Sequence, residues 1–207
     1  MGYYIFSYGI KTNRIKKVFS SKDQELLAKV EQNDTFENYS DFQPDAFKTI
    51  PAKALKDIIN GDIFDTKSNY AYGYALIGIC ATLGTELPYT QEIKLGYETD
   101  LINNVLSEDF RIKEFNIEEE LFKDNSNPFV IPKIDDWPLI GLLTAEELVK
   151  FRAKLNDVQI TDESIEAFSD TEEEDEEKEF AYEHLRGILE NVNFCIENSL
   201  DMISFCH

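Results

Sequence analysis

Two histidines and three cysteines are the residues of this chain best suited to metal binding or nucleophilic catalysis. Cys206 and His207 are adjacent, but no further ligands lie at the spacing of a zinc site, which needs four ligands or three plus water. A nucleophile pair of His184 with Cys80 or Cys195 has no supporting motif around it. We therefore expect no metal, no cofactor and no catalytic thiol.

The cysteine pattern also bears on the compartment. Three cysteines at wide spacing are typical of buried free thiols in a reducing environment rather than of a disulfide framework. Tyr3, Tyr4 and Phe6 follow the first two residues without a basic region, which does not fit a signal peptide. These features predict a cytoplasmic protein.

Carboxylates are the reactive side chains that this chain has in excess. It holds 41 acidic and 20 basic residues and a net charge of −21. Residues 162–179 contain eleven acids and one base, Lys178, so about half of the net charge lies in this stretch. The run lacks the alternating ligands and central Gly of an EF-hand loop. Nothing in it singles out a carboxylate pair for glycoside hydrolysis, so we do not expect an enzyme.

Two interpretations of the acidic run are open. In the first it is a solvated, mobile surface segment that keeps the protein soluble. In the second it is an electrostatic docking surface for a basic protein, as in inhibitors that cover the basic cleft of a nuclease toxin. Clustered carboxylates argue against nucleic acid and anionic membranes as partners. The candidate partner-binding residues are Asp170, Glu172, Glu173, Glu174, Asp175, Glu176 and Glu177.

The element around which the rest must pack is residues 69–83. Apolar residues repeat there at helical spacing on nearly all sides, and no charge interrupts residues 70–85, which predicts a buried helix too short to span a bilayer. We expect Gly73 and Gly78 to allow close approach by other elements and Gly84 to end the helix in a left-handed conformation. The tyrosines at 70, 72 and 74 fit core packing, or alternatively a ligand pocket.

Further elements follow from local patterns. The first ten residues are typical of a strand, and Ser21 with Gln24 forms a capping box ahead of a short helix. Residues 51–60 form a helix with Pro at its first position and Gly61 after its end. A further helix is expected around residues 101–106.

The C-terminal third is expected to be mostly helical. Thr144 and Glu147 predict a capping box, after a loop that Trp137 and Ile140 anchor on the core. The acidic run leads into a long helix whose apolar stripe begins at Phe180. The last eight residues predict a short strand that pairs with the N-terminal one.

Three stretches resemble a family of uncharacterised bacterial proteins. They are YGYALIGICATLGTEL, WPLIGLLTAEEL and LDMISFCH, which carry an aromatic-Gly-x-Ala-Leu helix, a Pro-x-Ile-Gly-x-Leu turn and an aromatic-rich tail. The resemblance covers about a fifth of the chain and implies no catalytic residues. Similar small acidic bacterial proteins accompany secreted toxins as immunity partners, and the resemblance points in that direction.

The sequence thus predicts one α+β domain over residues 1–207, with helices around residues 69–83 and a small sheet that uses both termini. We expect a non-enzymatic protein that binds a basic protein partner, in its sharpest form a bacterial immunity or antitoxin-like inhibitor of a toxin or effector. The alternative is a small-molecule-binding protein or enzyme with a pocket lined by Tyr70, Tyr72 and Tyr74.

Overall fold

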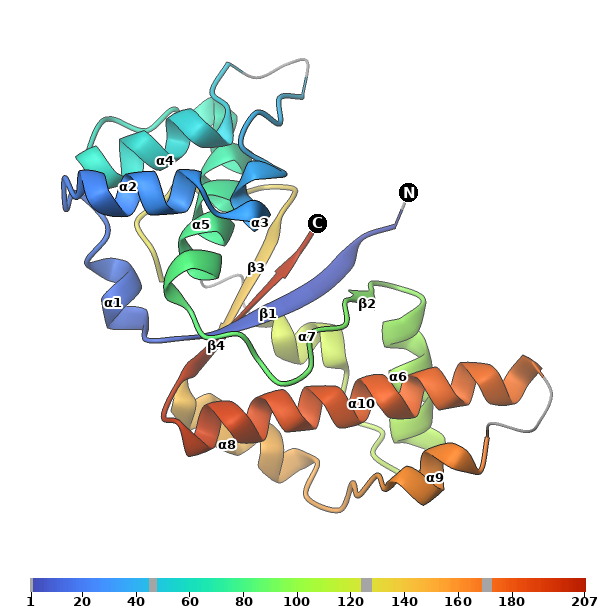
Figure 1. The fold of residues 1–207 in the computed structure, drawn as a ribbon. Coiled ribbons are helices and arrows are strands. Elements are labelled where there is room, and N and C mark those ends of the chain that lie inside the picture. Colours follow the sequence, from blue (N-terminus) through green and yellow to red (C-terminus); the bar gives the residue numbers. More distant parts are fainter. Residues whose placement is uncertain (1, 45–47, 124–127, 169–172) are drawn as a thin grey trace.

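An antiparallel sheet of four strands in the order β2-β1-β4-β3 lies at the centre of the fold (Figure 1). The computed structural model describes residues 2–44, 48–123, 128–168 and 173–207, the last range without the side chains of residues 173–175. The strands are β1 (Tyr4–Ile10), β2 (Ile93–Lys94), β3 (Leu139–Leu143) and β4 (Asp201–Cys206).

The two terminal strands pair along their whole length, as the sequence predicted. In β1 and β4 the register runs from Ile5 opposite Cys206 to Ile10 opposite Asp201. The other edge of β4 pairs with β3, so the C-terminal strand lies inside the sheet. β1 pairs with only two residues of β2 and makes one further bridge, between Gly9 and Thr85.

Strand alternation directs side chains into two separate cores. Phe6 and Phe205 stack at 5.7 Å between ring centroids on one face of the sheet. Ile5 and Met202 point into the core on the other face. Each face needs a helical layer to cover it, because successive residues of a strand point to opposite sides.

The N-terminal half of the chain forms the first layer, drawn in blue to green in Figure 1. Its central helix is α5, with every residue from 70 to 80 buried. The layer consists of α1 (Thr12–Lys16), α2 (Gln24–Glu31), α3 (Asp34–Glu37), α4 (Pro51–Asn60), the short 3-10 helix η1 (Thr66–Ser68) and α5 (Asn69–Leu83).

Two glycines let neighbouring elements approach α5 closely. A Cβ added at Gly78 would lie 2.4 Å from the ring of Phe36 in α3, and one at Gly73 would lie 2.6 Å from Ile134. Both distances are shorter than van der Waals contact, so even Ala would force its neighbour to move. The predicted role of these two glycines is thereby confirmed.

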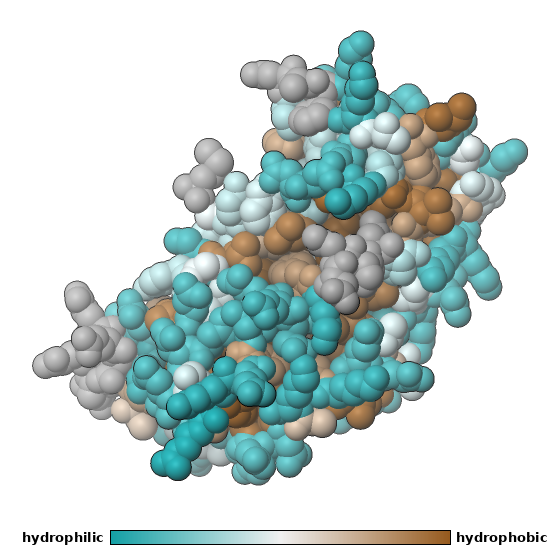
Figure 2. All heavy atoms as spheres, turned by 180° about the vertical axis from the view of Figure 1, so that it is seen from behind, coloured by the Kyte–Doolittle hydropathy of each residue, from teal (hydrophilic) through white to brown (hydrophobic). Residues whose placement is uncertain are grey.

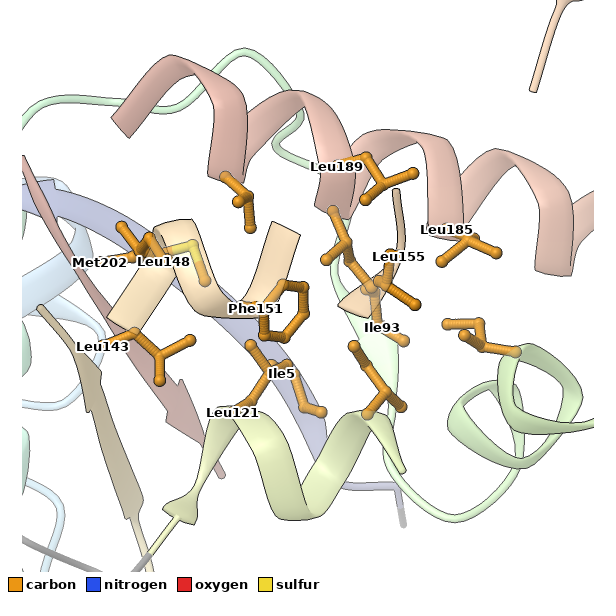
Figure 3. Close-up of a cluster of buried hydrophobic side chains, with 14 of the residues drawn as sticks. Ile5, Ile93, Leu121, Leu143, Leu148, Phe151, Leu155, Leu185, Leu189 and Met202 are labelled. Carbon is orange, nitrogen blue, oxygen red and sulfur yellow. The ribbon is translucent and has the colours of Figure 1, made fainter. Parts of the chain in front are cut away.

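The second layer holds α6 (Glu98–Glu108), α7 (Ile117–Leu121), α8 (Ala145–Lys154), α9 (Asp162–Glu166) and α10 (Glu173–Glu197). Figure 3 shows the core of this layer, where Leu185 and Leu189 of α10 point toward Phe151 of α8 and the sheet residue Ile5. The predicted α+β class, with helices around a buried central helix and a sheet built from both termini, is confirmed.

Three local predictions are wrong. Gly84 has an extended conformation, with φ −76° and ψ −179°, rather than a left-handed one. α2 is capped by Asp23, whose carboxylate accepts from the backbone of Leu26, because Lys22 has φ 57° and breaks a helix started at Ser21. Leu139–Leu143 is strand β3 and not part of a loop.

The surface is mostly polar. Figure 2, seen from behind, shows hydrophilic side chains over most of the lower half of the molecule. Within the described residues, no helix combines the length and the apolar composition that a membrane span requires.

Candidate functional site

Helices α6 and α10 pack against each other through apolar stripes. The stripe of α6 is Ile102, Val105 and Leu106. That of α10 includes Ala181, Leu185, Ile188 and Leu189. An amphipathic helix keeps its charged residues on the side that faces water, so both helices carry their carboxylates outward. Figure 1 shows α10 crossing α6 within the N-terminal half of α10, whose first residues belong to the acidic run.

Two adjoining hollows lie between α6 and the N-terminal half of α10. The larger has a volume of about 350 Å³ and is lined by Gln91, Tyr97, Glu98, Leu101, Glu176, Glu177 and Phe180. The smaller has about 150 Å³ and is lined by Leu101, Asn104, Val105, Glu108, Glu177, Lys178 and Ala181. Because the two share Leu101 and Glu177, we treat them as one feature, called the α6–α10 groove.

Two aromatic side chains in the groove are half exposed. The exposed fractions are 51% for Tyr97 and 50% for Phe180. The Tyr97 hydroxyl donates to the carboxylate of Glu177 at 2.8 Å, and the Nζ atom of Lys94 lies 5.5 Å from the centroid of the Tyr97 ring. Exposed aromatic rings in a concave surface are typical anchors of protein interfaces.

The groove is electronegative. Its lining includes four carboxylates, on Glu98, Glu108, Glu176 and Glu177. Lys178 is the one basic residue among those that line it, and its Nζ atom lies 3.4 Å from Asp109. A cation that enters the groove therefore meets an excess of negative charge.

The predicted partner-binding residues are placed only in part. Glu176 and Glu177 are exposed and line the groove. Residues 173–175 begin α10, and their side chains are not described. Asp170 and Glu172 lie outside the described residues. The predicted mobility of residues 162–179 therefore stays a prediction. Asp162 belongs to α9 and forms an ion pair with Arg186 at 2.5 Å.

The sequence analysis missed the other half of the groove. Glu98 and Glu108 lie far before the acidic run in the sequence and reach it only because α6 packs on α10. Phe180 falls at helical spacing with the buried stripe, yet it is half exposed because it lies one turn before His184, ahead of the part of the stripe that is buried. The one local feature that indicates an exposed ring is the position of Phe180 directly after the acidic run.

Beside the groove, His184 is buried in a polar network. Its Nδ1 atom lies 2.6 Å from the hydroxyl of Tyr89, and its Nε2 atom lies 3.1 Å from a carboxylate oxygen of Glu98. The Nε2 contact lies outside the angles of a hydrogen bond, so it is mainly electrostatic. The same carboxylate oxygen accepts from the backbone of Lys94 at 2.7 Å.

Burial lowers the pKa of His184, although Glu98 opposes the shift, so the imidazole is neutral at pH 7. A neutral imidazole has one N–H. A carboxylate only accepts, which places the proton on Nε2 and leaves Nδ1 to accept from Tyr89. Burial raises the pKa of Tyr89 above its usual range. His184 and Tyr89 are therefore both uncharged, and their contact positions the segment that carries Tyr89 against α10.

The cysteines are buried and unpaired in disulfides. Cys80 lies in α5, in the layer opposite to His184, while Cys195 lies eleven residues after His184 on the same helix, a distance of about 16 Å. Burial raises the pKa of Cys195 and of Cys206 to about 12, so these thiols are protonated at neutral pH. No group of three metal-binding side chains occurs in the described part of the chain.

The three tyrosines of the alternative pocket lie in the core. Tyr72 is fully buried, and its hydroxyl donates to Asp57 at 3.1 Å and accepts from the backbone of Asp65. The hydroxyl of Tyr70 donates to the carbonyl of Thr49 at 2.7 Å, and the ring of Tyr74 packs against aromatic neighbours. Core packing accounts for all three positions.

Comparison with known proteins yields a family without an assigned activity. A search of curated proteins and a search of solved structures each give no match for the chain. A family model described as a domain of unknown function, DUF7691, matches residues 1–207. The chain therefore belongs to the DUF7691 family.

Proposed function

We propose that this chain is a non-enzymatic protein that binds a basic protein partner through the α6–α10 groove. The observation that carries the proposal is the pairing of two half-exposed aromatic rings, Tyr97 and Phe180, with four carboxylates in one concave site. Solvated acidic surfaces that serve only solubility have no need of exposed rings.

The charge of the groove selects the partner. A lysine or arginine side chain can lie against the face of Phe180 and reach Glu176 or Glu177 on the same helix. The excess of carboxylates over the whole chain extends this attraction and raises the rate of encounter with a basic surface. The same charge disfavours nucleic acid and anionic membranes as partners.

The two aromatic rings supply binding affinity that the carboxylates alone do not provide. Exposed ion pairs contribute about 0–1 kcal/mol each, so carboxylates give specificity and rate more than affinity. Burial of a half-exposed ring adds an apolar contribution of about 1–2 kcal/mol. A binding site that combines Tyr97 and Phe180 with several carboxylates has the composition of a protein interface.

The sharpest form of the proposal is a bacterial immunity or antitoxin-like inhibitor that acts in the cytoplasm. It is supported by the acidic groove and by the resemblance to small acidic proteins that accompany toxins. In this form the partner is a basic toxin or effector, and the groove covers its substrate-binding surface.

The test is a pull-down from lysate at low and high salt, with four baits and identification by mass spectrometry. The baits are the wild-type protein, Phe180→Ala, the triple variant Glu108→Gln, Glu176→Gln and Glu177→Gln, and a control triple variant. The control, Glu37→Gln, Asp41→Asn and Asp62→Asn, removes as much charge from exposed positions near α3 and α4.

We expect the wild-type and control baits to retain one basic protein at low salt, and both groove variants to fail to retain it. A protein that all four baits retain equally, or an acidic protein that depends on Phe180, would contradict it. A partner with a toxic activity that the wild-type chain suppresses would support the inhibitor form.

A further inference from the structure

A cavity of about 310 Å³ opens between β1 and the segment of residues 86–92. At one end β1 pairs with that chain through Ile5 and Ile93, and at the other through Gly9 and Thr85. Between these two pairs, seven residues face only three residues of β1. The segment therefore bulges away from the sheet and leaves a hole at the edge of the strand.

The hole lies beside the backbone of Ser7. The backbone of Tyr4 exchanges two hydrogen bonds with that of His207, which follows β4. In an antiparallel pair every second residue bonds to the same neighbour, so the backbone N–H and C=O of residues 6, 8 and 10 also point toward β4. The odd-numbered residues face the other edge, where Tyr3 and Gly9 bond to Leu95 and Thr85. By the same alternation, the N–H and C=O of Ser7 point into the cavity.

Within the described residues, no backbone or side-chain group of the protein bonds to these two groups of Ser7. Ser7 is half-buried, so its N–H and C=O can pair with a polar group that enters the cavity in place of water. One amide group of a ligand supplies an acceptor and a donor at the spacing that a neighbouring strand would offer.

The rest of the lining specifies the charge of the ligand. Glu86 and Glu92 line the cavity, and no lysine or arginine is among the described residues that line it. The negative charge of Glu92 acts with burial to raise the pKa of Tyr39, and it also contributes to raising that of Tyr8. These phenols therefore stay protonated, and the hydroxyl of Tyr39 lies 2.5 Å from Nε2 of His207. The site disfavours anions and suits a cation.

The shape limits the size of the ligand. The volume lies at the small end of the range for ligand sites, which run from about 300 to 1,000 Å³. Its apolar floor is formed by Ile5, Leu87, Ile93, Leu121, Ile188 and Met202, and Figure 3 shows Ile5, Ile93 and Leu121 from the core side. The floor fits one aliphatic side chain.

We propose that this cavity binds a small cationic amide of the amino-acid amide or dipeptide amide class, which carries an ammonium and no carboxylate. The amide group pairs with the N–H and C=O of Ser7, the ammonium faces Glu86 and Glu92, and the side chain covers Ile5 and Ile93. This site borders the α6–α10 groove at Gln91 but is otherwise lined by different residues, and it does not depend on the proposed protein partner.

The test uses NMR titration of the full chain with three probes. Leucine amide carries both recognition groups, N-acetyl-leucine amide lacks the cation, and isopentylamine lacks the amide. We expect saturable shifts at Ser7, Tyr39 and Glu92 with leucine amide, and binding weaker by about tenfold or more with each of the other probes.

Two pairs of variants assign the contacts. Ser7→Pro removes the N–H that faces the cavity but no hydrogen bond to β4, while Ser7→Ala keeps that N–H; both lose the Ser7–Ser204 hydroxyl contact. We expect Ser7→Pro to bind leucine amide about tenfold more weakly than Ser7→Ala. Glu92→Gln should weaken binding likewise, and Glu119→Gln, exposed on α7, should not.

If Ser7→Pro does not fold, the probe series and the Glu92→Gln pair still decide the question. Equal shifts with all three probes, or no saturable shift at ~10 mM leucine amide, would overturn the proposal. A crystal structure grown with leucine amide that holds only ordered water at Ser7 would overturn it too.

Discussion

The Tyr89 hydroxyl lies 2.6 Å from Nδ1 of His184, a contact that ties the segment of residues 86–92 to helix α10. The backbone of Tyr89 adds two hydrogen bonds to the side-chain amide of Asn191, each 2.9 Å long. The segment is thus held at its middle by α10 and at its ends by β1. This arrangement places the cavity at Ser7 beside the middle of α10, while the α6–α10 groove forms at the N-terminal part of the same helix.

The substitution Tyr89→Phe tests this tie. It leaves Nδ1 of the buried His184 without a donor, so we expect the free energy of unfolding to fall by about 1–3 kcal/mol. Urea denaturation measures the change. Tyr97→Phe removes an exposed hydroxyl that donates to Glu177, and the expected loss there is below about 1 kcal/mol. Equal losses in the two variants would contradict the assigned role.

The ring of Tyr89 packs directly against Gly187 of α10, where a larger residue would leave no room for it. A Cβ at Gly187 would lie 2.2 Å from Cγ of Tyr89, so the ring must move in Gly187→Ala. We expect a loss of about 1–3 kcal/mol from overpacking, although Ala favours helix by about 1 kcal/mol over Gly. In a Tyr89→Ala background the loss should disappear. A double-mutant cycle by urea denaturation measures this coupling, and strict additivity would contradict the contact.

Stability should fall as the pH drops below neutrality. Burial lowers the pKa of His184 and of His207 in the folded protein, so the unfolded chain binds more protons. The contribution of each neutral imidazole is present above the unfolded pKa of about 6.5 and is lost as the pH falls through and below that value. Urea denaturation at pH 7.5 and pH 5.5 measures the difference.

His184→Gln supplies the control for this pH dependence. The variant lacks one of the two histidines with a lowered pKa, so its stability should differ less between the two pH values than that of the wild type. An unchanged pH dependence would show that His184 does not contribute to it. NMR titration of the imidazole signals would give both pKa values directly.

The three thiols should be inert in the native protein. Cys80 is completely buried, and burial raises the pKa of Cys195 and Cys206 to about 12. Alkylation requires the thiolate and access, so we expect iodoacetamide at pH 8 to modify none of them until urea unfolds the chain. Mass spectrometry after timed quenching measures this. Rapid labelling of Cys195 in the native protein would contradict the packing of α10 on β4.

Elements with a strong local pattern could be predicted from the sequence. Helix α5 has the predicted bounds because its apolar residues, glycines and lack of charge all indicate one buried helix. The pairing of β1 with β4 followed from two apolar, β-branched terminal stretches. β3 was missed because a run of five apolar residues between Pro138 and Thr144 has neither strand nor helix periodicity.

The two candidate sites depend on relationships that no local pattern contains. The acidic run indicated Glu176 and Glu177, but Glu98 and Tyr97 join them only through the packing of α6 on α10. The cavity at Ser7 arises from a change of register between the pairs Ile5–Ile93 and Gly9–Thr85. Register is set by the assembled sheet, so a single sequence does not reveal such a hole.

The central claim, that the α6–α10 groove binds a basic protein, is tested most directly by affinity. The measurement is the Kd of the purified partner against NaCl concentration, for the wild type, the triple variant at Glu108, Glu176 and Glu177, and the control triple variant. At ~0.05 M NaCl we expect the groove variant to bind about tenfold or more weakly, with a shallower salt dependence, while the control matches the wild type. Equal Kd values and equal salt dependence for all three proteins would contradict the claim.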